Sequence, residues 1–475
     1  MVRVTRVCVL AMMLLACRGQ PEGVLSAIAD TTRQLTGAVV SQPLIQVVAQ
    51  GAGEILARTV YDVTRLPVAV VRALGGNGNI PVLINENNIA DQADKIIGEF
   101  KAGLGNEDAV LNFEELITKY GYKVEKHETV TEDGYGLTMF RIPGNGSVVF
   151  LMHGLLGSAD DFVITGKESS LGYLLADEGY DVWFGNARGN KHSRRHNELD
   201  PSESKFWDFS WHEIGYFDLP AMIDYVLNTT NKKTLKYIGH SQGTTSFFVM
   251  GSERPDYNDK IALMIALSPG AYYTHAVSPF IRLTAPASGF LGMIAQGIGL
   301  HEVLPDGPLI RILKTILCGT GPIAEIMCYN QLLVGCGFGF AEMNVTNLPV
   351  INGHTPSGAS LKQVLHYGQL FNSADFRQYD HGTTKNLRVY GNEVPPSYVL
   401  ENISAPVSLF YSDHDWFSHP TDVDALYQRL SNAVDIHKIP HPQFNHLDYI
   451  WAKNVKTLIF DRVRKLLDAF DKPQN

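Results

Sequence analysis

The chain has 475 residues, of which 45% are hydrophobic and 19% are charged, and this globular composition excludes a disordered, collagen-like or coiled-coil protein. With 49 acidic and 39 basic residues, the formal net charge is −10, so no overall basic character points to nucleic acid as a partner. The length fits one large α/β domain with insertions, or two domains.

The first 19 residues have the features of a secretory signal peptide. Arg3 and Arg6 precede an apolar run over 7–16, which is too short to span a membrane. A buried N-terminal helix, or a bacterial lipoprotein signal at 14–17, is the alternative. Acceptor motifs for N-glycosylation follow at Asn145, Asn228, Asn344 and Asn402. No later apolar run is long enough to be a transmembrane segment, so we expect a secreted or lysosomal protein.

Residues 20–105 form an N-terminal extension in which we recognise no chemistry. The stretch 24–74 is rich in Ala, Val, Leu and Ile and contains few charges. It fits an extension packed on the domain, an amphipathic arm, a pro-segment or a lipid contact. The glycine-rich segment 75–79 is a candidate hinge or cleavage loop.

From about residue 106, short apolar runs alternate with helix-length patterns. The predicted strands are 122–129, 137–142, 147–152, 180–184, 234–238, 261–267, 407–410 and 436–439, and the predicted helices include 170–178, 218–227 and 455–470. This alternation predicts an α/β fold with a mostly parallel sheet flanked by helices. Residues 271–400 break the rhythm, so we expect an inserted, mainly helical cap between two core segments, 106–270 and 401–475.

A candidate nucleophile lies in the motif Gly239-His240-Ser241-Gln242-Gly243, which matches G-x-S-x-G. The motif follows a predicted strand and opens a predicted helix at Thr244, as in the nucleophile elbow. A serine hydroxyl needs a general base and an orienting carboxylate, and in this type of fold the chain order is Ser, then Asp or Glu, then His.

Two loops after residue 400 offer these partners. Asp415 follows the predicted strand 407–410, and His446 follows the last predicted strand, where sites in open α/β sheets lie. We therefore expect Asp415 to be the acid and His446 the base. For the oxyanion hole we expect the N–H groups of Leu155, in the loop after strand 147–152, and of Gln242.

These residues together resemble the acid lipase family, which comprises the gastric and lysosomal lipases and their insect relatives. The segments that carry the resemblance are 153–160, 181–190, 206–210, 216–221, 239–245, 415–416 and 445–448. The resemblance spans about residues 108–470. It implies an α/β-hydrolase core with a helical cap, and hydrolysis of acylglycerols or steryl esters by Ser241, Asp415 and His446, with Leu155 and Gln242 at the oxyanion. The long extension and the segment 417–420, which lacks the acidic residue often found before the proline, depart from the family.

Three cysteines follow the signal segment, and their spacing leaves their pairing open. The family pattern implies a Cys318–Cys328 disulfide with Cys336 free. No histidines stand at metal-ligand spacing from these cysteines, and we expect neither a metal nor a cofactor.

The expected partner is a lipid ester at an oil–water or micelle interface, and the oligomeric state stays open. The glycine-punctuated apolar stretch 281–300 predicts that part of 275–340 is a lid that moves at this interface. The alternative functions are a carboxylesterase for smaller or specialised esters and a non-catalytic lipid-binding protein.

Overall fold

The computed structural model describes residues 106–278, 281–282, 285–287, 289, 292, 299–305, 336 and 341–471, which all lie in one compact unit. The predicted signal peptide, the extension to residue 105, the Cys318–Cys328 pair and most of the stretch 281–300 lie outside the described residues.

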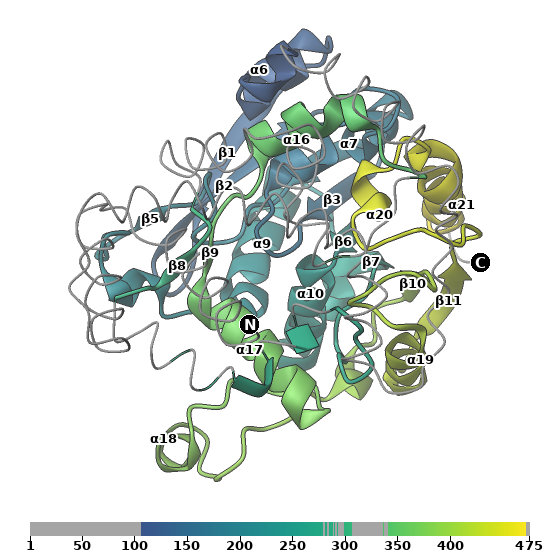
Figure 1. Ribbon diagram of the computed structural model, residues 1–475. Helices are drawn as coiled ribbons and strands as arrows, with labels where there is room; N and C mark the ends of the chain where they lie inside the picture. The colour runs from purple at the N-terminus through teal and green to yellow at the C-terminus, as the bar shows by residue number, and fades with distance from the viewer. Residues whose placement is uncertain are drawn as a thin grey trace, which may run out of the picture. The chain divides into compact units, whose positions relative to one another are not determined.

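A central sheet organises this unit (Figure 1). Its strands are β1 (Glu125–Val130), β2 (Tyr135–Ile142), β3 (Val148–Met152), β4 (Asp181–Phe184), β5 (Arg195–His196), β6 (Leu235–His240), β7 (Ile261–Leu267), β10 (Val407–Tyr411) and β11 (Ala433–Lys438). The order across the described sheet is β1-β2-β4-β3-β6-β7-β10-β11, with β5 paired to β2. The strands from β4 to β11 run parallel, whereas β2 is antiparallel to β1, β4 and β5.

Helices connect these strands. They are α6 (Phe113–Lys119), α7 (Leu171–Asp177), α8 (Trp211–Glu213), α9 (Leu219–Thr230), α10 (Gln242–Glu253), α16 (Leu348–His354), α17 (Leu361–Ser373), α18 (Thr383–Val389), α19 (Pro420–Arg429), α20 (Asp448–Trp451) and α21 (Asp461–Ala469). Shorter helical turns include η3 (Ala159–Phe162) before α7, and the π-helical turns η5 (Ile214–Asp218) and η10 (Lys456–Phe460) lead into α9 and α21.

The burial of each strand follows from its place in the sheet. Every residue of β3 and β6 is buried, because helices cover both faces of a central parallel strand. In β1, at the edge, half-buried and exposed residues alternate, as they do in a strand with one face in water.

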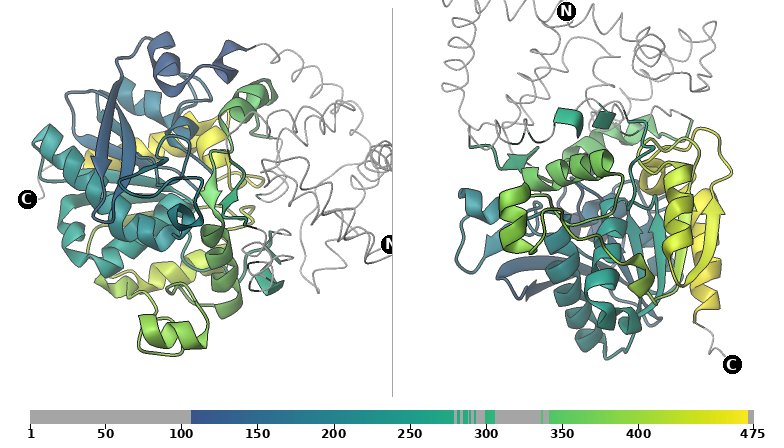
Figure 2. Two further views of the ribbon diagram at one scale, coloured as in Figure 1. Left: turned by 90° about the vertical axis from the view of Figure 1, so that its left-hand side faces the viewer. Right: turned by 90° about the horizontal axis from the view of Figure 1, so that it is seen from below.

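Helices pack on both faces of the sheet (Figures 1 and 2). Phe150, Trp183 and Tyr237 belong to one buried hydrophobic cluster with residues of α9, α10 and α19. Phe184 is the neighbour of Trp183 in β4 and therefore points to the opposite face. There it meets α7 so closely that a Cβ on Gly172 would lie 2.7 Å from the Phe184 ring.

The predicted α/β class with a mostly parallel sheet flanked by helices is confirmed, with small differences in element ends. The predicted strand 122–129 begins only at Glu125, because Tyr122 still donates its N–H to Ile117 at the end of α6. The strand predicted at 234–238 extends to His240, since its last residues pair with β7. The closing helix predicted from residue 455 begins as η10.

Between β7 and β10 the described residues form α16, α17, α18 and a small antiparallel pair, β8 (Glu302–Val303) with β9 (Ala359–Ser360). The chain enters α17 at Ser360, whose hydroxyl accepts the Gln363 N–H as an N-cap. Gln363 in turn lies against the start of α10, where Gln242 Nε2 donates to Gln363 Oε1 at 2.7 Å. One helix of the region between β7 and β10, α17, therefore contacts the elbow directly.

Candidate active site

The elbow is a single-residue turn between β6 and α10. Ser241 has φ 50° and ψ −117°, a conformation that an L-residue holds only under the constraint of its surroundings. A Cβ on Gly243 would lie 2.3 Å from the Met152 carbonyl oxygen, and one on Gly239 would lie 2.9 Å from the Gly243 carbonyl carbon. Only glycine fits at either place, which explains the spacing of the motif.

His446 connects Ser241 to Asp415. Its Nε2 lies 2.8 Å from Ser241 Oγ, and its Nδ1 lies 3.0 and 3.1 Å from the two carboxylate oxygens of Asp415. An ionised carboxylate only accepts hydrogen bonds, so Nδ1 carries the proton and the Nε2 lone pair faces the serine hydroxyl. This arrangement suits proton transfer from Ser241 to His446.

Asp415 is buried and is held in its ionised form. Its Oδ1 accepts the backbone N–H groups of Phe417 and Ser418 at 2.9 and 3.0 Å. Burial favours the neutral acid, but the charge and hydrogen bond of His446, with the donors at Ser268 and Ser418, hold the pKa of Asp415 below its usual value. Asp413, two residues earlier, is half exposed and pairs instead with Lys438.

Hydrogen bonds fix the loop that carries His446. Asn445 Oδ1 accepts the N–H groups of Leu447 and Asp448, and Asp448 Oδ2 accepts the N–H of Asn445 at 2.8 Å. The His446 carbonyl accepts from His240 Nε2 at 2.8 Å. Burial, with the nearby charge of His446, lowers the pKa of His240 to about 3, so His240 stays neutral and donates.

The loop predicted for the oxyanion hole runs directly against the nucleophile. A Cβ on Gly154 would lie 3.2 Å from Ser241 Cβ, so the residue before Leu155 packs against the nucleophile turn. Neither Leu155 nor Gln242, the first residue of α10, donates its N–H to an acceptor in the described part of the chain. Two N–H groups beside Ser241 are therefore available for an oxygen anion.

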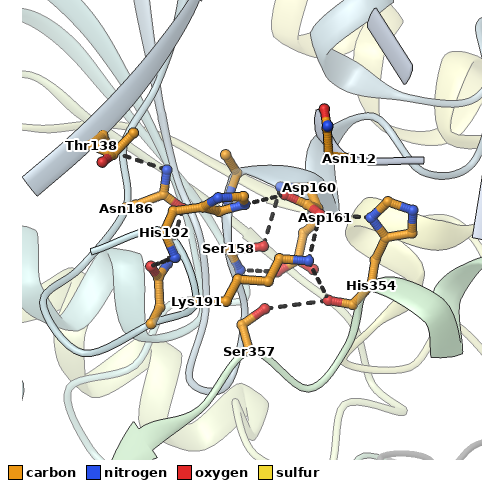
Figure 3. Close-up of polar contacts among 12 residues, drawn as sticks. Asn112, Thr138, Ser158, Asp160, Asp161, Asn186, Lys191, His192, His354 and Ser357 are labelled. Atoms are coloured by element: carbon orange, nitrogen blue, oxygen red, sulfur yellow. Dashed lines mark hydrogen bonds and ion pairs between the residues drawn. The ribbon is translucent and has the colours of Figure 1, made fainter. Parts of the chain in front are cut away.

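A buried polar network is centred on Asp160, which follows this loop in the chain (Figure 3). Asp160, in η3, binds Lys191 Nζ at 2.6 Å, His192 Nε2 at 2.7 Å and His354 Nδ1 at 2.6 Å. Burial would raise the pKa of Asp160, but Lys191 and His192 hold it well below its usual value. The next carboxyl, Asp161, has its pKa raised to about 7 by burial and by the charge of Asp160.

This network joins three segments that are distant in the chain. Lys191 also donates to the His354 carbonyl at 2.9 Å, and Ser357 donates its N–H to the Leu156 carbonyl at 2.8 Å. The predicted oxyanion loop is thereby tied to the chain just after α16, and the end of α16 is tied to the loop after β4.

The residues predicted for the catalytic site come together in the structure, and further residues that were not predicted support them. Ser241, Asp415, His446, Leu155 and Gln242 come together at the carboxyl ends of the central strands. The residues that support them were missed, namely Ser268, His240, Lys191, His192 and His354. The sequence signal for these residues is weak. Each is an ordinary polar residue near the end of a helix or strand, and no motif assigns it a partner.

The predicted glycosylation acceptors and Cys336 differ in their exposure. Asn145 and Asn228 are exposed, while Asn402 is exposed but donates its Nδ2 to the Ser252 carbonyl. Asn344 is half buried and caps a helical turn, η8 (Val345–Asn347), through its Oδ1. Cys336 is a free, buried thiol whose pKa is raised by burial.

Two features are absent from the described residues. No group of three or more His, Cys, Asp or Glu side chains there is arranged to hold a metal ion. Within the same residues, no helix combines the length and the apolar character needed to cross a membrane.

Comparison with known proteins gives two family matches. A model described as the partial alpha/beta-hydrolase lipase region matches residues 113–166, and the alpha/beta hydrolase fold matches residues 147–288. Among curated proteins, "Lipase 1" of Drosophila melanogaster is 44% identical over 363 residues, which cover 76% of this chain and 80% of the relative.

Two mammalian relatives match over a similar length. The gastric triacylglycerol lipase of Bos taurus is 37% identical and the lysosomal acid lipase/cholesteryl ester hydrolase of Homo sapiens is 35% identical. Each alignment covers 76% of this chain, with 92% and 91% of the respective relative.

Proposed function

The chain belongs to the family of the gastric and lysosomal lipases, and we propose that it hydrolyses acylglycerol esters with Ser241 as the nucleophile. The observation that carries this proposal is the hydrogen-bonded series from Ser241 through His446 to Asp415, beside two available N–H groups. A non-catalytic lipid-binding protein has no use for such a series. The reaction needs neither a metal nor a cofactor.

In the acylation step, Ser241 Oγ attacks the carbonyl carbon of the ester and its proton passes to His446 Nε2. The N–H groups of Leu155 and Gln242 hold the negative oxygen of the tetrahedral intermediate. The ester C–O bond then breaks, and His446 returns the proton to the leaving glycerol oxygen. Asp415 stabilises the imidazolium that exists between these two transfers.

In the deacylation step, a water molecule takes the place of the alcohol. His446 Nε2 accepts a proton from this water, whose oxygen attacks the acyl carbon. The same two N–H groups hold the oxyanion again. Collapse of the intermediate releases the fatty acid and returns the proton to Ser241 Oγ.

The substrate class rests on the relatives. The bovine relative is named for triacylglycerol and the human one also for cholesteryl esters. We therefore propose acylglycerols as the main substrates and steryl esters as the second class. A carboxylesterase for small esters is the alternative within the same chemistry.

Export through the secretory pathway, to the extracellular space or the lysosome, is part of the proposal. The basic and apolar start of the chain supports it, as do the exposed acceptor side chains Asn145 and Asn228. We further propose that residues 271–400 form the cap over the acyl site and that part of 275–340 moves at a lipid surface. Hydrogen exchange with and without lipid micelles tests the movement, and unchanged protection throughout this segment contradicts it.

Purified protein on a lipid panel tests the proposed function. The panel contains a triacylglycerol emulsion, a cholesteryl ester and a soluble short-chain ester, from about pH 4 to about pH 8. We expect emulsified acylglycerol to be the best substrate, with labelling of wild type but not Ser241→Ala by a fluorophosphonate probe. Preference for the soluble ester favours the carboxylesterase. Absence of both hydrolysis and labelling contradicts the proposed function.

A further inference from the structure

We propose that Ser268 is a positioning residue of this site, whose hydroxyl holds Asp415 and His446 in the geometry that proton transfer requires; this inference rests on the proposed function. Ser268 Oγ donates to Asp415 Oδ2 at 2.6 Å and lies 2.8 Å from His446 Nδ1. It does not contact Ser241 among the described hydrogen bonds, so it acts through the acid and the base.

The backbone holds Ser268 at this place. It is the first residue after β7, and its N–H donates to the Phe410 carbonyl of the neighbouring strand β10 at 3.0 Å. Its φ is 57°, in the left-handed region that a serine adopts only when its surroundings require it. Only 1% of its surface is exposed. Ser241 and Ser268 thus follow adjacent strands, and both have a positive φ.

The hydrogen bonds have a defined direction. A hydroxyl has one proton, and Asp415 as an anion can only accept, so Ser268 donates to Asp415. The remaining lone pairs of Ser268 Oγ face the Nδ1–H of His446, which is shared between Asp415 and Ser268. The hydroxyl therefore contacts both partners of the pair at once.

Ser268 completes the set of donors around Asp415. Both backbone donors bind Oδ1, whereas Oδ2 receives its hydrogen bonds from Ser268 and His446. In the described part of the chain, Ser268 is the only side chain besides His446 that donates to this carboxylate. Without the hydroxyl, the buried Oδ2 of Asp415 loses one hydrogen-bond donor, and the carboxylate rotates away from His446 more easily.

This arrangement predicts a kinetic effect on turnover rather than on substrate binding. His446 becomes positively charged only after it takes the proton of Ser241, and Ser268 helps to stabilise that state through Asp415 and through its own lone pair. Loss of the hydroxyl also removes an acceptor for the Nδ1–H of protonated His446. The imidazolium then forms less readily, so the acid limb of the rate profile moves to lower pH.

The experiment compares Ser268→Ala, Ser268→Gly and Ser408→Ala in the full-length protein. Both changes at position 268 delete the hydroxyl, but glycine adopts the positive φ without strain. Ser408 is the matched control, because its buried hydroxyl also bonds an aspartate, Asp435 at 3.0 Å, on the far side of β10 from Ser268. Rates with a soluble ester are measured from about pH 4 to about pH 8.

We expect kcat to fall about tenfold in both Ser268 variants, as for loss of a hydrogen bond to a charged group, with KM unchanged and the acid limb shifted to lower pH. We expect Ser408→Ala to keep the wild-type kcat and pH profile. A fall of less than about twofold in Ser268→Ala, or wild-type kcat in Ser268→Gly, would overturn the inference. The wild type serves as the control for the proposed function. If the wild type does not hydrolyse the ester, the proposed function fails; if it does, the Ser268 variants test the inference alone.

Discussion

The proposed nucleophile, Ser241, and its two hydrogen-bonded partners are held in place by different means. Ser241 is fixed by the backbone, since it sits between β6 and α10 with glycines that leave no room for movement. Asp415 and His446 stand on loops, and side-chain and backbone hydrogen bonds fix them, including those of Ser268, His240 and Asn445. The elbow therefore depends on steric fit, whereas the acid and base depend on a network of donors.

The largest effect is expected from Ser241→Ala, which leaves this geometry intact and removes only the attacking oxygen. Ester hydrolysis should fall by about 10³-fold or more, because binding and the oxyanion hole alone support a small residual rate. The measurement is kcat on emulsion and soluble ester, with unfolding curves to show that the variant is folded. Retention of more than about a tenth of wild-type activity would move the nucleophile elsewhere.

Asp415→Asn disrupts the hydrogen-bond network that holds the acid and the base. The amide cannot orient the imidazole in the required tautomer, so kcat should fall by about 10³ to 10⁴. Asp413→Asn is the matched control, since that carboxylate is half exposed and pairs with Lys438. We expect it to lower kcat far less, and the reverse ranking would assign the acid to Asp413.

Gly243→Ala tests whether steric fit holds the turn at Ser241. Its Cβ would lie 2.3 Å from the Met152 carbonyl oxygen, which belongs to the sheet and cannot yield. The free energy of unfolding should fall by about 3 kcal/mol, together with activity. Gly136→Ala, where the new Cβ meets the Arg195 side chain at 3.2 Å, should cost far less. Equal unfolding curves for the two variants contradict the steric account.

The smallest expected effect concerns the loop of the base. Burial, with the charges of Glu342 and Asp415, raises the pKa of Asp448 to about 8, so the folded protein holds this proton more tightly than the unfolded chain does. Its contribution to stability is present below the unfolded pKa of about 4 and is lost as pH rises toward about 8.

Asp448→Asn keeps the oxygen that accepts the Asn445 N–H and removes the titration. Between about pH 5 and about pH 8, its free energy of unfolding should therefore depend less on pH than that of the wild type, by on the order of 1 kcal/mol per pH unit. Denaturant unfolding at the two pH values measures the difference. Parallel pH dependence of variant and wild type would show that Asp448 does not titrate in this range.

The core of the fold and the meeting of Ser241, His446 and Asp415 could be predicted because their signals are local or ordered. Buried parallel strands appear as apolar runs, and the elbow needs two glycines and a serine within five residues. Asp415 and His446 followed from their positions after strands in the required chain order. Even there, the strand before the elbow was predicted too short, because its pairing with β7 is not visible in its own residues.

The supporting residues depend on contacts between distant segments. Ser268 meets Asp415 across 147 positions, and His354 meets Asp160 across 194. A serine after a strand or a histidine at a helix end is common and has no partner until the chain folds. Chain order and local sterics thus determine which groups are candidates for the reaction. The packing of loops from separate strands determines which donors hold those groups, since a hydrogen bond depends on distance in space and not on distance along the chain.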